Sequence, residues 1–237
     1  MPSPFLTAEW RWLAMLNYEI DPEVLKPFVP AGTELDSREG KTHVSVVGFH
    51  FRYARLRGVE IPFHTHFEEV NLRFYVRRTV GNETRRGVVF IKELVPRRAI
   101  AWTARWFYNE NYVAVPMSHR IHKYGLERRA IYEWSFGGEP HHLETRAECE
   151  PFLPPDDSFE AFITEHYWGY ARQRDGGTLE YQVEHPRWRV WTALEAELHC
   201  DPAALYGKTF APFLTVAPAS AFLADGSAVS VYPGVRI

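Results

Sequence analysis

Residues 69–77 alternate strictly between two kinds of side chain, and this period of two constrains the fold more than any other feature of the sequence. Successive side chains of a β-strand point to opposite faces. The apolar face of the predicted strand carries Val70, Leu72, Phe74 and Val76. The polar face carries Glu69, Asn71, Arg73 and Tyr75. A strand that is apolar on one face belongs to a sheet packed on a core, so the chain is predicted to be mainly β.

Other segments are predicted to be strands because they are rich in β-branched and aromatic residues, which favour a pleated surface. They cover residues 44–53, 87–94, 131–136 and 181–198, and also 99–108, where a strand is favoured and a helix is the alternative. Turns are predicted at Gly81-Asn82, at Gly125, at Gly137-Gly138 and, as a hairpin turn, at Asp225-Gly226. Successive strands with few helices between them favour an antiparallel barrel or sandwich.

Three segments carry helix signals. A short helix is predicted at residues 21–25, where Asp21 suits the N-cap and Pro22 the first turn. One long helix is predicted to begin with a capping box of Asp157 and Glu160 and to end before Gly176-Gly177. Its apolar residues at helical spacing are Phe159, Phe162, Ile163, Tyr167 and Tyr170. A short helical turn is predicted at residues 201–205. No linker or repeat divides the chain, so residues 1–237 are predicted to form a single α+β domain.

Charge and cysteine content narrow the functional classes. The net charge is -3, so no overall positive field attracts nucleic acid or an anionic membrane. The two cysteines, Cys149 and Cys200, have neither CxxC nor metal-ligand spacing, which suits a reducing compartment. The N-terminal residues lack a signal-peptide pattern, and no segment has the length of a membrane span. We therefore expect a cytoplasmic protein.

The polar face of the predicted strand is the main candidate for a binding site. If it faces a cavity, Glu69 and Arg73 place a carboxylate and a guanidinium together in a low dielectric, where they can orient a small carboxylate or carbonyl ligand. If it faces water, the same residues are the solvated side of a half-buried sheet. The alternation alone leaves both hypotheses open. The same question applies to Arg98 and Arg105, and to His185 and Trp188.

Histidines offer a second candidate. In a strand, His64 and His66 would share a face and meet one metal ion together with a nearby carboxylate. Pro62 indicates a loop or a strand edge instead, so these two histidines are only weak metal candidates, and exposed or hydrogen-bonded imidazoles are the alternative. The sequence contains neither a GxSxG elbow nor a GxGxxG fingerprint. No cofactor is expected.

Several segments together resemble a known bacterial family. They are residues 21–25 and 29–32, the strand at 69–76, Arg105-Trp106-Phe107-Tyr108, the segment 162–172 and His185-Pro186-Arg187-Trp188. The chain resembles the YqjF-like family, domain of unknown function 2071, which is related to acetoacetate decarboxylase. The resemblance implies a large antiparallel β-barrel or cone that encloses a small cavity. It also implies that Glu69 corresponds to the glutamate lining that cavity in the family.

The chemistry of the decarboxylase depends on lysine. There a lysine forms a Schiff base with the substrate, and an adjacent lysine lowers its pKa. The comparable stretch here, residues 106–112, contains no lysine. Lys92 is the only lysine within a convincing predicted strand, and its neighbour in sequence is Glu93 rather than a second basic residue. The resemblance therefore does not carry decarboxylation over to this chain.

Three functional hypotheses follow. The first is a barrel that binds a small anionic or carbonyl-bearing molecule; its candidate residues are Glu69, Asn71, Arg73, Arg98, Arg105, Tyr112 and Trp188. The second is a lyase or decarboxylase-like enzyme that uses Lys92 or an acid–base pair of Glu69 and His185. The third is a metal-binding barrel that uses His64 and His66. The expected partner is a small molecule rather than nucleic acid or membrane, and a homo-oligomer is left open.

Overall fold

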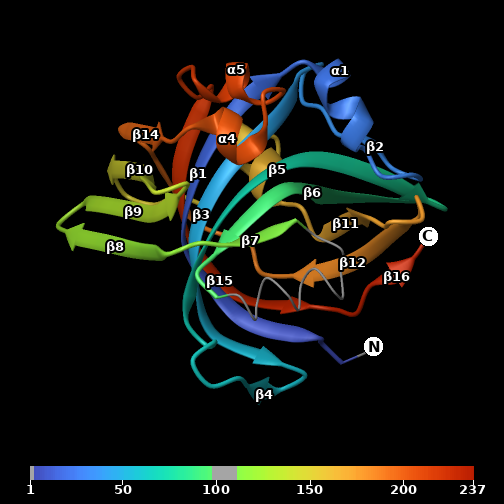
Figure 1. The fold of residues 1–237 in the computed structure, drawn as a ribbon, viewed down its shortest axis with the longest axis horizontal. Coiled ribbons are helices and arrows are strands. Elements are labelled where there is room, and N and C mark those ends of the chain that lie inside the picture. Colours follow the sequence, from blue (N-terminus) through green and yellow to red (C-terminus); the bar gives the residue numbers. More distant parts are fainter. Residues whose placement is uncertain (1–2, 98–110) are drawn as a thin grey trace.

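The computed structural model of the chain describes residues 3–97 and 111–237, and strands dominate it (Figure 1). The strands are β1 (Leu6–Ile20), β2 (Glu34–Leu35), β3 (Thr42–Leu56), β4 (Val59–Glu60), β5 (Phe67–Val80), β6 (Glu83–Val95), β7 (Tyr112–Ala114), β8 (Met117–Tyr124), β9 (Glu127–Phe136), β10 (Glu139–Glu148), β11 (Trp168–Arg172), β12 (Thr178–Glu184), β13 (Val190–Thr192), β14 (Glu195–His199), β15 (Ser220–Val231) and β16 (Val235–Arg236). The helices are α1 (Pro22–Leu25), the 3-10 turn η1 (Lys26–Phe28), α3 (Phe159–Thr164), α4 (Pro202–Tyr206) and α5 (Ala211–Leu214).

The larger sheet closes into a ring. Its strands pair in the order β15-β1-β3-β5-β6-β11-β12, and β12 also pairs with β15. Most of these pairs are antiparallel, whereas β11 runs parallel to β6. Closure leaves the sheet with an inner and an outer face, which is the arrangement needed to enclose a cavity. The prediction of a mainly β chain is confirmed.

A smaller sheet of four strands, in the order β14-β10-β9-β8, packs against the outside of the ring. The two sheets and the helices α1, α4 and α5 share a buried apolar core, to which β5 contributes Val70, Leu72, Phe74 and Val76. Gly48 of β3 permits close approach at this contact, because a Cβ atom there would lie 2.7 Å from the ring of Tyr132. The predicted apolar face of residues 69–77 is thus the outer face of β5.

The prediction of one long helix is wrong. Only Phe159–Thr164 is helical, and its N-cap is Ser158, whose hydroxyl accepts a hydrogen bond from the amide of Ala161, rather than Asp157. Residues Trp168–Arg172 instead form β11, which joins β6 to β12 and so completes the ring. The apolar spacing of the segment fits a helix, but the pairing of β11 with two neighbouring strands outweighs that local pattern.

The hairpin turn predicted at Asp225-Gly226 is also wrong, because both residues lie inside β15. Gly226 has φ +75° and pairs with Arg11 of β1. A Cβ atom on Gly226 would lie 1.9 Å from the carbonyl oxygen of Trp10. The glycine therefore serves the close approach of two strands and not a chain reversal.

The other sequence predictions fare differently. The structure confirms the predicted strands at 44–53, 87–94 and 131–136. It also confirms the three glycine turns that follow β5, β8 and β9, and the short helices capped by Asp21 and Asp201. The stretch 181–198 contains parts of three strands, β12, β13 and β14, rather than one. The strand predicted at 99–108 lies outside the described residues. Within the described part of the chain, no helix has the length and apolar character to cross a membrane.

Candidate functional site

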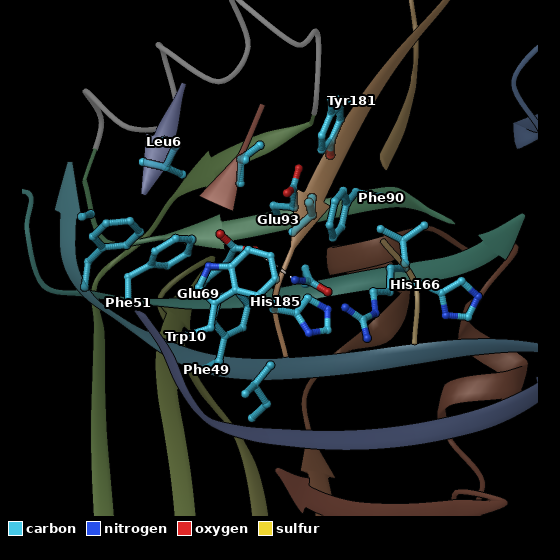
Figure 2. Close-up of a pocket in the computed structure, with 18 of the residues that line it drawn as sticks. Leu6, Trp10, Phe49, Phe51, Glu69, Phe90, Glu93, His166, Tyr181 and His185 are labelled. Carbon is cyan, nitrogen blue, oxygen red and sulfur yellow. Dashed lines mark hydrogen bonds between the residues drawn. The ribbon is translucent and has the colours of Figure 1, made fainter. Parts of the chain in front are cut away.

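The ring encloses a cavity of about 230 Å³, to which each of its seven strands contributes at least one side chain (Figure 2). The polar stripe of this cavity comes from β5 and consists of Glu69, Asn71 and Arg73. These side chains are 3%, 1% and 8% exposed. The polar face of β5 therefore looks inward, and the alternative that it is the solvated side of the sheet is wrong. Tyr75 ends the row and packs in the inner core instead of lining the cavity.

Strand register explains which neighbours share the cavity with the polar stripe. On β3, Phe49 pairs with Glu69, and on β6, Glu93 pairs with Asn71. The pairing with β6 is irregular at Leu72 and Arg73, since Leu72 faces Lys92 but Arg73 faces Phe90. Directly paired residues of an antiparallel sheet lie on the same face. Glu93 and Phe90 therefore point into the cavity, whereas Lys92 points out with Leu72.

Glu69 is a carboxyl group whose charge is strongly disfavoured. Its Oε1 accepts a hydrogen bond from Asn71 Nδ2 at 2.9 Å, and its Oε2 accepts one from the Tyr112 hydroxyl at 3.3 Å. Burial raises the pKa of Glu69 to about 7, and these two bonds with the charge of Arg73 offset only part of that effect. At neutral pH the group can therefore both donate and accept a proton.

Arg73 is a buried cation with spare hydrogen-bonding capacity. Its guanidinium carbon lies 5.7 Å from the centre of the Tyr75 ring. Its Nε is buried and makes no hydrogen bond to any residue of the described ranges 3–97 and 111–237. Leaving such a donor unsatisfied costs free energy, which an anionic or carbonyl ligand would recover.

His166 lines the cavity beside this stripe, and the sequence did not single it out. Its Nε2 lies 3.5 Å from Oδ2 of Asp36, which accepts a hydrogen bond from Arg86 Nε at 2.7 Å. Burial lowers the pKa of His166 to about 4, so the imidazole is neutral at neutral pH. Burial opposes the charge of Asp36, but His166 and Arg86 outweigh it and hold the pKa of Asp36 below its ordinary value. A neutral imidazole backed by a carboxylate is a suitable hydrogen-bonding group for a ligand.

His185 and Trp188, for which the sequence left the orientation open, also line the cavity. Their rings stack with centres 4.2 Å apart, and Trp188 Nε1 donates to Ser227 Oγ at 2.8 Å. Burial lowers the pKa of His185, so this imidazole is neutral as well. The hydrogen bonds of the Glu69 carboxylate go to Asn71 and Tyr112, so Glu69 and His185 share the cavity without forming a directly bonded pair in the described chain.

The remaining candidates from the sequence lie elsewhere or outside the described residues. Lys92 donates from Nζ to the backbone carbonyl of Leu205, on the outer face of the ring. His64 and His66 lie in the loop before β5 and not in a strand; only His64 reaches the cavity. Residues 3–97 and 111–237 contain no cluster of three histidine, cysteine, aspartate or glutamate residues that could hold a metal ion. Arg98 and Arg105 fall within the residues that the structure does not describe.

Comparison with solved structures identifies the class of fold. The acetoacetate decarboxylase of Legionella pneumophila matches with a TM-score of 0.69 and 13% identity over 100% of this chain and 88% of that chain. The enduracididine biosynthesis enzyme MppR complexed with pyruvate matches with a TM-score of 0.69 and 14% identity, over 100% of this chain and 91% of its own. An acetoacetate decarboxylase-like enzyme from Sphingomonas wittichii RW1 matches with a TM-score of 0.67 and 12% identity, over 99% and 94%. The fold is therefore acetoacetate decarboxylase-like.

Sequence comparison narrows this class to one family. The chain belongs to the DUF2071 family of uncharacterized conserved proteins, which it matches over residues 7–228. It is 27% identical to the uncharacterized protein YqjF of Bacillus subtilis (strain 168) over 195 residues. This aligned region covers 80% of this chain and 76% of YqjF.

Proposed function

We propose that the cavity binds a small molecule carrying a carboxylate or carbonyl group, and that Arg73 is its main polar contact. The observation that carries this proposal is the buried Arg73 guanidinium, whose Nε finds no hydrogen-bond acceptor among the described residues. A carboxylate placed beside it gains a charge-assisted hydrogen bond in a site largely shielded from water. Asn71 and the protonated form of Glu69 offer further donors along the same strand. MppR, which shares the fold, has been solved with pyruvate bound.

The test compares two arginines of the same strand. Arg73 faces the cavity, whereas Arg77 is exposed and donates from Nε to Glu34 Oε1 at 2.9 Å. Affinity for pyruvate and propionate is measured by calorimetry in the wild-type protein and in the variants Arg73→Met and Arg77→Met. Loss of a hydrogen bond to a charged group predicts about 10-fold to 150-fold weaker binding in Arg73→Met. Arg77→Met should bind like the wild type.

Unliganded stability provides an independent control for the same variants. Burying a charge that lacks a full set of hydrogen-bond partners costs free energy, and an apolar side chain of similar length removes that cost. Arg73→Met should therefore unfold at the same or a higher temperature than the wild type without ligand. Equal affinity of both variants for the carboxylates, or no measurable binding by the wild type, would refute the proposal.

A second candidate function is acid–base catalysis by Glu69, as in a lyase-type enzyme. The observation that favours it is a buried carboxyl group that lines a ligand-sized cavity, where burial raises the pKa of Glu69 to about 7. A general base works best when its pKa lies near the working pH. The reaction class is proton abstraction next to a carbonyl. No lysine is among the described residues that line the cavity, so this candidate does not involve a Schiff base.

This candidate is tested without knowledge of the natural substrate. Exchange of the methyl protons of pyruvate for deuterium is followed by NMR with the wild-type protein, Glu69→Gln and Glu68→Gln. Glu68 is adjacent in sequence but faces away from the cavity. On the opposite side of the strand, its carboxylate forms a hydrogen bond with His119. Catalysed exchange that is lost in Glu69→Gln and kept in Glu68→Gln supports an enzyme. Exchange at the uncatalysed rate in all three samples leaves only the binding function.

We also propose a cellular location, a domain organisation and a partner for this protein. Cys149 and Cys200 are both free thiols, which agrees with a reducing, cytoplasmic location. We propose that residues 1–237 act as one domain, and that its expected partner is the small molecule in the cavity.

A further inference from the structure

We infer that the ligand of this cavity is an aryl-bearing carboxylic or 2-oxo acid rather than a short-chain one. The inference rests on the proposed function of the same cavity and extends it from the polar group to the rest of the molecule. It is carried by the shape and chemistry of the walls on either side of the polar stripe formed by Glu69, Asn71 and Arg73.

The wall formed by β1 and β3, together with the start of β5, is a continuous aromatic surface. Phe51 stacks on Phe67 with ring centres 4.4 Å apart and planes at 17°. Trp10 meets Phe49 edge-on at 5.4 Å and Trp188 at 6.3 Å. Edge-to-face and offset-stacked contacts of this kind are the arrangements that aromatic rings prefer, and a further ring can extend them.

The wall on the other side of the stripe is mainly apolar, although Glu93 of β6 also belongs to it. It comes from β6 and β12 and includes Val88, Phe90, Tyr181 and Val183. In Figure 2, Trp10 and Phe49 lie on one side of the Glu69 carboxyl group, and Phe90 and Tyr181 lie on the other. The polar row of β5 thus lies between two walls that are mainly apolar and aromatic, and Glu93 of β6 is the charged residue on one of them.

The size of the cavity fits a ring with a short polar head. A dry apolar cavity of about 150 Å³ is enough to hold benzene. The cavity here measures about 230 Å³, which leaves room beside a phenyl ring for a carboxylate or 2-oxo acid group. A molecule the size of pyruvate would satisfy the polar stripe but leave the aromatic wall without a partner. Burial of a phenyl group supplies free energy that a short acid lacks.

The experiment measures dissociation constants for two matched pairs of acids, pyruvate with phenylpyruvate and propionate with 3-phenylpropionate. Burial of a phenyl side chain predicts that the aryl acid of each pair binds between about 10-fold and about 100-fold more tightly. The second pair contains no keto group, so it separates the contribution of the ring from that of the carbonyl.

Two phenylalanine variants locate the ring. Phe51→Leu removes part of the aromatic wall, and Phe152→Leu, at a surface position outside the cavity, is its matched control. Phe51→Leu should reduce the preference for the aryl acids over the short acids by about 2-fold to 10-fold. Phe152→Leu should leave this preference unchanged. The comparison of acids in the wild-type protein stands even if Phe51→Leu does not fold.

The outcomes separate this inference from the function on which it rests. Equal affinity for aryl and short acids, with binding that still depends on Arg73, overturns the inference and keeps the proposed function. An aryl preference that is equal in Phe51→Leu and Phe152→Leu also overturns it, because the ring would then bind elsewhere. Absence of binding by all four acids overturns both.

Discussion

The pH dependence of stability should reveal the buried carboxyl group of Glu69. Its pKa is raised from 4.5 to about 7, chiefly by burial. Between those two values the folded protein binds more protons at this site than the unfolded chain does, so the free energy of unfolding falls as pH rises. The free-energy cost of ionising Glu69 in the folded protein is therefore small near pH 4.5 and fully present above about pH 7.

The variant Glu69→Gln removes this titration while keeping the side chain polar and close in size. One pKa unit corresponds to about 1.4 kcal/mol, so the shift predicts an ionisation penalty of about 3 kcal/mol above about pH 8. Relative to the wild type, the glutamine variant should therefore gain about 2 to 3 kcal/mol in stability from about pH 5 to about pH 8. Other groups titrate in both proteins and cancel in the difference.

The assay is urea unfolding of both proteins at several pH values across this range. Glu139→Gln, at an exposed position at the start of β10, measures the effect of a generic exchange of glutamate for glutamine. A stability difference between the wild type and Glu69→Gln that does not change with pH would refute the reasoning. A wild type that gains stability over the variant as pH rises would show that the carboxylate is stabilised by its surroundings instead.

Three further predictions concern the frame of the site. Gly226→Ala should lower the free energy of unfolding by about 3 kcal/mol or more, because the added Cβ would lie 1.9 Å from the Trp10 carbonyl oxygen. Urea unfolding measures this change, and a loss of less than about 1 kcal/mol would show that the strands can separate at little cost. Asp36→Asn should lower the unfolding temperature, because Arg86 loses the charge of its buried partner; an unchanged temperature would contradict this. Lys92→Met should leave carboxylate affinity measured by calorimetry unchanged, because Lys92 lies on the outer face, and a loss above about 10-fold would place it in the site.

Strands with one apolar and one polar face were predictable from the sequence. Strands buried on both faces, or with an apolar spacing that also fits a helix, were not. Residues 69–77 show the period of two because β5 has one apolar face and one polar face. β1 gave no such signal, since Leu13, Ala14, Met15 and Leu16 are all buried, on alternating faces of the sheet. A strand buried on both faces reads as an apolar run rather than an alternation. The segment 168–172 was predicted as part of a helix because its aromatic residues recur at helical spacing. Only its pairing with β6 and β12 shows that it is a strand.

The site was predictable in part. The inward row of Glu69, Asn71 and Arg73 followed from alternation once an enclosed cavity was assumed, and only three-dimensional closure of the ring could decide between cavity and solvent. His166 could not be found, because its role depends on Asp36, which is far away in sequence. The outward orientation of Lys92 depends on the irregular pairing near residue 91, which leaves no sequence signal.

The most direct test of the proposed binding site is a crystal structure of the protein with pyruvate. The account predicts the carboxylate inside the ring, with an oxygen within about 2.7–3.2 Å of a guanidinium nitrogen of Arg73. Pyruvate bound only at the surface, or an Arg73 guanidinium fully occupied by a carboxylate of the protein itself, would contradict it.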